Sequence, residues 1–379
     1  MRVRPTFEGL WRNADFMRLW AAQAISQFGT QVSLLAIPLA AAITLDASAR
    51  QMGVLVAAET APFLLFGLIA GVLADRVHRR PLLFWTDIGR AVLFLTIPIA
   101  WLIDALSYAQ LLAVAFLAGT LTVFFEVAYQ SYMPVLIGRG DLVEGNSKLE
   151  TSRAVALIGG PGLAGLLIQL LGAPLAVLID ALSFLGSGAF IRRIRKSEPP
   201  IDHAARRPML TEIGEGLGYI ARHPLLRPIA GCTGTSNLFN SAFVAIFILF
   251  ATRDLGLSAG WIGLIFGVGS AGFLLGALGT QRLNVRLGVG PTIIVGIAGA
   301  SLAQIVVPFV NGPTLVVVLT LMLVMAVTSV SGAVYNITQV SLRQTITPDR
   351  LLGRMNATMR FIVWGVMPIG GLLAGSWVS

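Results

Sequence analysis

The chain has 379 residues, of which 56% are hydrophobic and only 12% are charged, whereas a soluble domain carries about 25% charged residues. Apolar runs of about 20 residues recur along almost the whole length, which indicates a polytopic helical membrane protein and excludes a β-barrel, whose strands alternate in short segments. The formal net charge of +9 does not indicate a nucleic-acid-binding protein, because the basic residues lie in short segments between apolar runs rather than along one soluble face.

Six apolar segments in the first half of the chain each have the length of a membrane-spanning helix. We expect these spans at residues 17–44, 52–74, 82–103, 108–132, 154–171 and 174–194. The basic and aromatic residues 1–15 predict a lead helix at the membrane interface, and the mixed charges between Gly138 and Arg153 predict a polar loop.

A short charged hinge separates the second and third spans. It contains Gly71, Asp75, Arg76, Arg79 and Arg80. A charge left in hydrocarbon costs about 2.5–3.5 kcal/mol on insertion scales, so the hinge is expected at a membrane surface, and its arginines favour the cytoplasmic one. The pattern resembles the loop signature of the major facilitator superfamily, although many members have Gly at the place of His78. The alternative is a basic loop that merely follows the positive-inside rule.

The second half of the chain repeats this plan after a polar linker at residues 196–225. In the linker, Ile213, Leu217 and Ile220 share one helical stripe, which predicts an amphipathic surface helix. Five further spans are expected at 227–251, 259–280, 289–310, 314–340 and 354–378. The glycines after Pro368 in the last span repeat the glycines after Pro161 in the fifth span. Duplicated halves are therefore expected, with domains at 1–195 and 226–379.

The fold class predicted from these spans is an all-α integral membrane protein with two pseudo-symmetric helix bundles. With the N-terminus in the cytoplasm, all of the 27 Lys and Arg residues except Arg50 and Arg253 fall at the inner ends of the spans. The resemblance implies a location in the bacterial inner membrane. The resemblance implies twelve helices, of which eleven are present, so either the sequence is truncated, which we favour, or the final helix is missing.

The likeness extends to the branch of the superfamily that contains macrolide-efflux pumps and the enterobactin exporter. It is carried by the hinge, by residues 87–91 and by residues 341–354, and it implies alternating access by two six-helix bundles. The segment from Gly160 to Gly165 resembles the fifth-helix signature of drug–proton antiporters, with Ala164 where a glycine is usual. The expected gating residues are Gly71, Asp75, Arg76, Arg79, Arg80, Asp87, Arg90, Glu126, Gly160, Pro161 and Gly165. The alternatives are headgroup anchoring for the charges and helix packing for the small residues.

Proton coupling requires an ionisable group inside the membrane, and two carboxylates fit that position. Glu59 and Asp180 lie within spans and away from the inner loops. Glu59 is the better candidate, because Asp180 is expected nearer the outer end, where it could serve as an anchor. A structural pairing role remains open for both.

The substrate cavity is expected among the first, fourth, seventh and tenth spans. The candidates that could line it are Gln27, Gln31, Asn237, Asn240, Tyr335, Asn336 and Gln339. Each of them could instead form a helix-to-helix hydrogen bond, worth about 0.6 kcal/mol. A roomy apolar wall with a few polar groups suits amphipathic organic molecules.

The function predicted from the sequence is proton-coupled export of small molecules such as drugs or siderophores. The first alternative is an importer or symporter of a small metabolite, and a membrane-embedded transferase is a weaker one. No Walker-type nucleotide motif and no catalytic constellation is visible, so the chain is not expected to be an enzyme, and the proton gradient is the expected energy source. The single cysteine, Cys232, leaves no metal site expected, and a monomer without other cofactors is predicted.

Overall fold

The computed structural model describes the backbone of residues 9–138, 141–198 and 209–377. It also describes their side chains, except those of residues 68, 71–76, 143, 209–213, 349–350, 352–354, 357 and 376–377. Within this part of the chain the secondary structure is helical and contains no strand. Ten helices among the described residues are long and apolar enough to cross a membrane, and α2 runs beside them, which agrees with the expected fold class.

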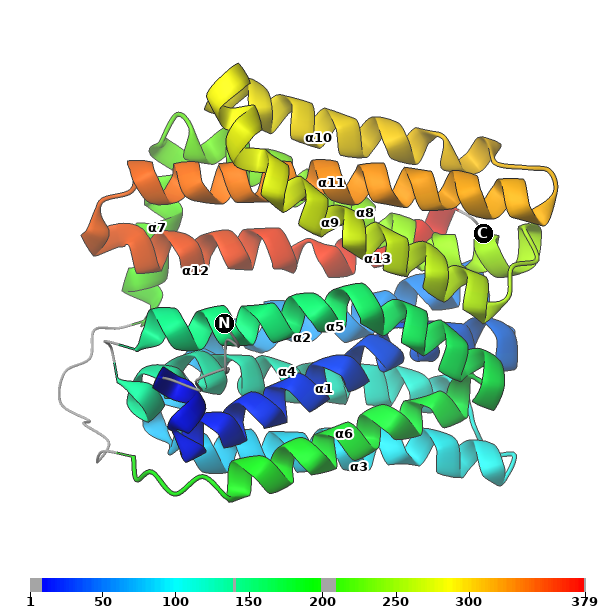
Figure 1. The fold of residues 1–379 in the computed structure, drawn as a ribbon, viewed down its shortest axis with the longest axis horizontal. Coiled ribbons are helices and arrows are strands. Elements are labelled where there is room, and N and C mark those ends of the chain that lie inside the picture. Colours follow the sequence, from blue (N-terminus) through cyan, green and yellow to red (C-terminus); the bar gives the residue numbers. More distant parts are fainter. Residues whose placement is uncertain (1–8, 139–140, 199–208, 378–379) are drawn as a thin grey trace, which may run out of the picture.

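The first half of the chain forms the lower group of helices in Figure 1. A short 3-10 turn, Gly9–Arg12, precedes α1 (Ala14–Leu39), which ends in a π-helical turn, Ala40–Thr44. The helices that follow are α2 (Ala49–Arg76), α3 (Arg79–Leu102), α4 (Tyr108–Ile137), α5 (Leu142–Leu171) and α6 (Ala173–Arg192).

The second half forms the upper group in Figure 1 and begins after the surface helix α7 (Met209–Arg222). Its helices are α8 (Leu226–Leu249), α9 (Ala259–Leu287), α10 (Val289–Ile305), α11 (Thr314–Ile346), α12 (Asp349–Gly365) and α13 (Met367–Trp377). A π-helical turn, Phe250–Asp254, ends α8, and a 3-10 turn, Val307–Phe309, follows α10.

Two predicted boundaries are wrong. The segment expected as a polar loop between Gly138 and Arg153 is mostly the start of α5, because its charges form pairs one helical turn apart, such as Lys148 with Glu144 at 3.0 Å. The span expected at 354–378 is divided into α12 and α13 at Val366. Pro368 lies just beyond this division and cannot donate a backbone hydrogen bond.

A repeated turn relates the two halves. The Leu45 amide donates to the Ala40 carbonyl at 3.1 Å, and the Leu255 amide donates to the Phe250 carbonyl at 3.0 Å, so both α1 and α8 end in a π turn. The next residue in each half has a positive φ, 50° at Asp46 and 63° at Gly256. This shared local geometry supports two halves of similar design.

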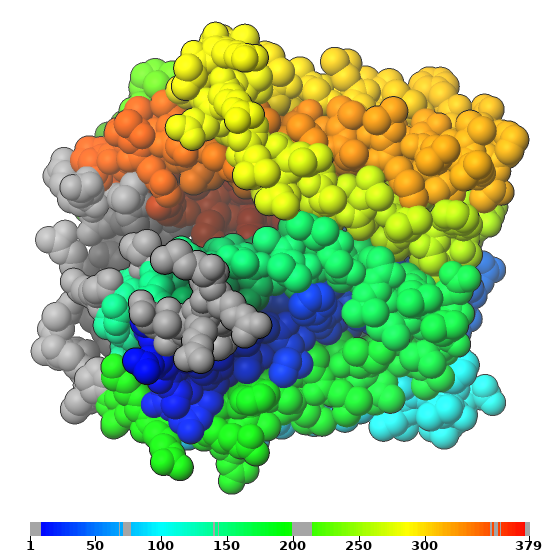
Figure 2. Space-filling view, in the orientation of Figure 1, coloured from blue at the N-terminus to red at the C-terminus, as the bar shows by residue number. Residues whose placement is uncertain are grey.

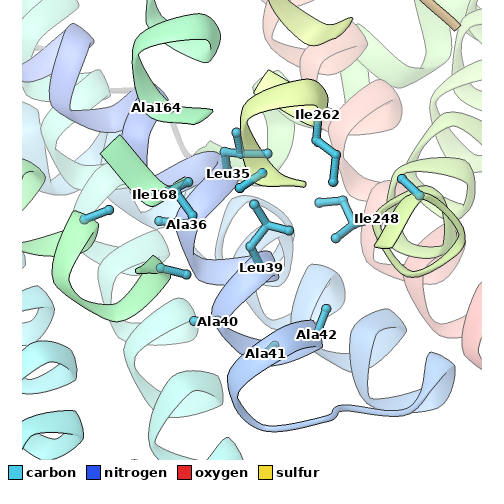
Figure 3. Packing of buried hydrophobic residues seen from close by; sticks show 14 of the residues in the cluster. Leu35, Ala36, Leu39, Ala40, Ala41, Ala42, Ala164, Ile168, Ile248 and Ile262 are labelled. Atoms are coloured by element: carbon cyan, nitrogen blue, oxygen red, sulfur yellow. The ribbon is translucent and has the colours of Figure 1, made fainter. Parts of the chain in front are cut away.

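The helices run between two ends of the molecule. We call the end with residues 77–78, 193–198 and 347–348 the basic end, and the end with residues 45–48, 103–107, 255–258 and 310–313 the far end; they lie at the left and the right of Figure 1. At the far end a single apolar core joins both halves. In Figure 3, Leu35 and Leu39 of α1 and Ile168 of α5 lie opposite Ile248 of α8 and Ile262 of α9.

Candidate functional site

A cavity of about 660 Å³ lies within the first half and reaches the contact with α12. It extends from α1 residues in the middle of the bundle, such as Gln27, to residues near the basic end, such as Asn146 and Arg153. Asn146 and the side chain of Arg153 are exposed, so the cavity opens to solvent at the basic end. Figure 2 shows a recess between the two halves on that side, whereas α5 and α9 touch toward the far end.

Backbone contacts between glycines close the far end. A Cβ atom on Gly165 of α5 would lie 2.8 Å from the Cα atom of Gly263 on α9, and one on Gly371 of α13 would lie 2.7 Å from the carbonyl oxygen of Gly53 on α2. Only residues without side chains allow helices to approach this closely. The cavity is therefore sealed on one side and open on the other.

The predicted motif from Gly160 to Gly165 lies at this seal. The Pro161 carbonyl faces Gly263, and Gly160 packs against the side chain of Gln31. Helix α5 continues through Pro161. The small residues therefore form the crossing of α5 with α9, which is compatible both with packing and with a gating role.

A buried ion pair lies at the cavity wall, which Arg90 lines. The Arg90 guanidinium pairs with the Asp87 carboxylate on the same face of α3, and the Ser187 hydroxyl of α6 donates to Asp87 at 2.6 Å. The Arg90 guanidinium carbon lies 4.3 Å from the ring centre of Phe125 and 4.2 Å from that of Phe184. Two aromatic faces and one carboxylate thus hold this cation inside the first half.

The two predicted proton-coupling carboxylates both line the cavity. Asp180 is fully buried, and its Oδ1 atom accepts a hydrogen bond of 2.9 Å from Ser183, while Oδ2 has no partner among the described residues. Glu59 is half-buried on α2. Along α6, Asp180 lies closer to Ala173 at the far end than to Arg192 at the basic end, and Gly29 of α1 packs directly on it. Its role as an anchor stays a prediction.

An ion pair across the two halves lies at the cavity. Arg360 of α12 is 3.5 Å from the Glu126 carboxylate of α4 and donates to the Gln130 side chain at 3.2 Å. Its guanidinium carbon is 5.0 Å from the ring centre of Trp364, and Trp364 contacts Phe63 of α2 edge to face at 4.7 Å. These contacts link the halves on the side where the cavity is open.

The predicted inner-face charge cluster is divided among separate places. The backbone amides of Arg79 and Arg80 donate to the Glu198 carboxylate at 2.9 and 2.8 Å, so this acid caps the N-terminus of α3. Asp87 and Arg90 pair with each other, and Glu126 pairs with Arg360. The side chains of Asp75 and Arg76, with Gly71, lie outside those that the structure describes.

Of the predicted substrate-cavity residues, Gln27 lines the cavity. Asn240 lines a second hollow of about 610 Å³ between α8 and α10. The other candidates, Gln31, Asn237, Tyr335, Asn336 and Gln339, are absent from the cavity wall within the described part of the chain. Tyr335 forms a hydrogen bond of 2.6 Å with Thr233, so the alternative of helix-to-helix hydrogen bonding holds for that residue.

Sequence reasoning missed Phe63, Arg360 and Trp364. A signal for them exists in their spacing, since Phe63 follows Glu59 by four residues and Trp364 follows Arg360 by four residues, which places each pair on one helix face. The described residues contain no group of three or more His, Cys, Asp or Glu residues that could hold a metal ion.

The family model described as the Major Facilitator Superfamily matches residues 19–372. The chain belongs to the Major Facilitator Superfamily. Its family and its fold are those of a multi-pass membrane transporter and not those of an enzyme. A transporter of this kind binds a small molecule, and the cavity is where we expect that molecule to bind.

Several superfamily members are similar over most of the chain. The multidrug efflux pump Tap of Mycolicibacterium fortuitum is 27% identical over 341 residues, which covers 87% of this chain and 81% of that protein. The Tap protein of Mycobacterium tuberculosis strain H37Rv is 27% identical, with 96% and 87% covered. The uncharacterized MFS-type transporter YfiS of Bacillus subtilis is 27% identical, with 98% and 89% covered.

Solved transporter structures share the fold at low sequence identity. A bacterial homologue of the iron transporter ferroportin in its inward-facing state gives a TM-score of 0.76 at 16% identity, covering 97% of this chain and 92% of that one. A bacterial homologue of the iron transporter ferroportin in an outward-facing state gives 0.57 at 16% identity, with 96% and 97% covered. The nucleoside transporter NupG gives 0.78 at 12% identity, with 96% and 90% covered.

Proposed function

We propose that the chain is a proton-coupled exporter of small amphipathic organic molecules, which works by alternating access in the bacterial inner membrane. The observation that carries this proposal is the cavity of about 660 Å³, which is sealed at the far end, open at the basic end and lined by two carboxylates without basic partners. A cavity that opens to one side only is the starting state that alternating access requires.

The basic end is assigned to the cytoplasm in this proposal. Cytoplasmic loops of membrane proteins carry an excess of Lys and Arg. At the basic end α6 ends at Arg192 and is followed by Arg193, Arg195 and Lys196. With this orientation the structure is the inward-open state, which accepts its cargo from the cytoplasm.

Glu59 and Asp180 supply the proton exchange in this mechanism. An isolated carboxylate in an apolar wall is stabilised either by a proton or by a nearby cation. Both residues lie in the first half, and residues 226–379 contain only two acidic residues, Asp254 and Asp349. The proton path is therefore assigned to the first half, and the second half provides the moving wall that carries Arg360 and Trp364.

Export is favoured over import by the relatives in the Tap group, which are multidrug efflux pumps by name. The fold does not choose a direction, since a nucleoside transporter shares it. Symport of a small metabolite is therefore the second candidate, and the same cavity would serve it.

Inverted membrane vesicles test this proposal. An exporter should accumulate drug in the acidified lumen and release protons from it when drug is added, and vesicles without the protein are the control. Proton-linked exit of preloaded substrate, together with uptake by whole cells, would instead establish the symporter. Net accumulation of drug that persists without any proton gradient would overturn the coupling.

A further inference from the structure

The charges on the cavity wall are paired, with two exceptions. Arg90 pairs with Asp87, Arg153 with Glu150 at 3.5 Å, and Arg360 with Glu126 at 3.5 Å. Among the described residues, Glu59 and Asp180 have no Lys, Arg or His partner within 4.0 Å. The cavity therefore presents unbalanced negative charge to its contents, which favours a cation over an anion.

The two unpaired carboxylates differ in how they can be reached. Asp180 has no exposed surface, and the Ser183 hydroxyl and the α1 backbone at Gly29 cover it. Glu59 retains exposed surface on the cavity wall. A proton can reach both groups, but a bulky molecule can contact only Glu59.

Aromatic rings stand next to Glu59. Phe63 lies one helical turn further along α2, on the same face, and its ring meets Trp364 edge to face at 4.7 Å. The guanidinium carbon of Arg360 lies 5.0 Å from the centre of the Trp364 ring, so this ring already contacts a cation. Aromatic faces beside a carboxylate are the arrangement that recognises organic cations.

The geometry points to a binding site for an organic cation with an apolar body, formed by Glu59, Phe63 and Trp364. The carboxylate neutralises the positive charge, and the two rings contact the apolar groups around it. Because Trp364 belongs to α12 and the other two residues to α2, both halves of the protein contribute to the site. This inference rests on the proposed function, since it names the charge of the transported molecule.

Equilibrium binding of radiolabelled tetraphenylphosphonium to the purified full-length protein in detergent tests the site. Tetraphenylborate, an anion of nearly the same size and shape, is the matched comparison, and its binding is measured in separate samples because the two ions precipitate together. The wild type should bind the cation saturably and should bind tetraphenylborate at least about tenfold more weakly. Glu59→Gln should weaken binding at least about tenfold, and Trp364→Ala about three- to tenfold, whereas Trp364→Phe should retain most of it.

Glu150→Gln provides the matched control, because Glu150 lines the same cavity but is exposed and paired with Arg153. It should leave the affinity within about twofold. Size-exclusion profiles and thermal unfolding verify that each variant is folded. Equal affinity in the wild type and Glu59→Gln, absent binding of the cation, or equal binding of tetraphenylborate to the wild type would each overturn the inference.

The proposed exporter function and the cation site can fail independently of each other. Proton-driven transport of neutral or anionic drugs without tetraphenylphosphonium binding would leave the exporter in place and remove the cation site. Saturable, Glu59-dependent binding without proton-driven transport would keep the cation site and remove the coupled exporter.

Discussion

Arg253 of the second half donates a hydrogen bond of 2.6 Å to the Asp46 carboxylate of the first half, and so joins the halves at the far end. The same guanidinium donates to the Ala47 carbonyl at 2.9 Å, next to the π turn that ends α1. Opening the cavity toward the far end requires these bonds to break, so they favour the state described here.

Arg253→Gln is therefore expected to shift the protein toward the arrangement that is open at the far end. The ion pair is solvent-exposed, and exposed pairs are typically worth about 0.2–1 kcal/mol, so the population should change about 1.4- to fivefold. Distances between spin labels in loops 103–107 and 310–313 measure the shift. Arg50→Gln, which removes another exposed far-end arginine, is the control, and an equal shift in that variant would show a general charge effect instead.

The crossing of α5 with α9 gives a second prediction. A Cβ atom on Gly165 would lie 2.7 Å from the Ala259 carbonyl oxygen and 2.8 Å from the Gly263 Cα atom, and these backbone atoms cannot rotate away. Gly165→Ala should hold the far end open and lower the rate of drug accumulation in vesicles at least about tenfold.

Gly162→Ala is the matched control on the same helix, since a Cβ atom there meets no atom within 4 Å. It should transport at about the wild-type rate. Similar loss in both variants would attribute the effect to the helix itself rather than to the contact between the halves.

The buried pair of Asp87 and Arg90 predicts a loss of stability. Asp87→Asn keeps the shape but leaves the Arg90 charge without its carboxylate, and breaking a buried pair in this way costs about 3–5 kcal/mol. Denaturant unfolding in detergent micelles measures the free energy of unfolding. Glu150→Gln removes one partner of an exposed pair and should change it by less than about 1 kcal/mol.

Much of the fold could be predicted from local properties of the sequence. The lengths of the apolar runs located the spans, because the thickness of the bilayer sets the length of a helix that crosses it. The polar segment before Arg153 is predicted as a loop but is helical, because ion pairs such as Glu144 with Lys148 stabilise a helix that lies outside the hydrocarbon. Pro368 stands at the division of α12 from α13, but Pro161 stands inside α5 without dividing it, so a proline alone does not predict where a helix ends.

The candidate site was less predictable, since it depends on which helices meet. Glu59, Asp180 and Gln27 stood out as polar residues within apolar runs, and the cavity contains all three. The pairing of Glu126 with Arg360 joins residues more than 230 positions apart, so no local pattern gives it. Tyr335 and Gln339 looked equally suitable, but they are buried between helices of the second half.

The two cavity carboxylates are expected to separate proton coupling from cargo binding. Asp180→Asn keeps the size of a side chain that is completely enclosed, but it removes the group that can carry a proton. The variant should lose at least about 90% of the drug accumulation driven by a proton gradient. It should still bind tetraphenylphosphonium within about twofold of the wild type and exchange labelled for unlabelled drug across the vesicle membrane, because Glu59 and Trp364 are unchanged.

Ser183→Ala, which removes only the hydroxyl donor to Asp180, is the control and should retain most of the coupled transport. Unaltered proton-driven accumulation in Asp180→Asn would exclude this residue from the coupling mechanism, and loss of both binding and exchange would show that it supports the architecture of the cavity instead.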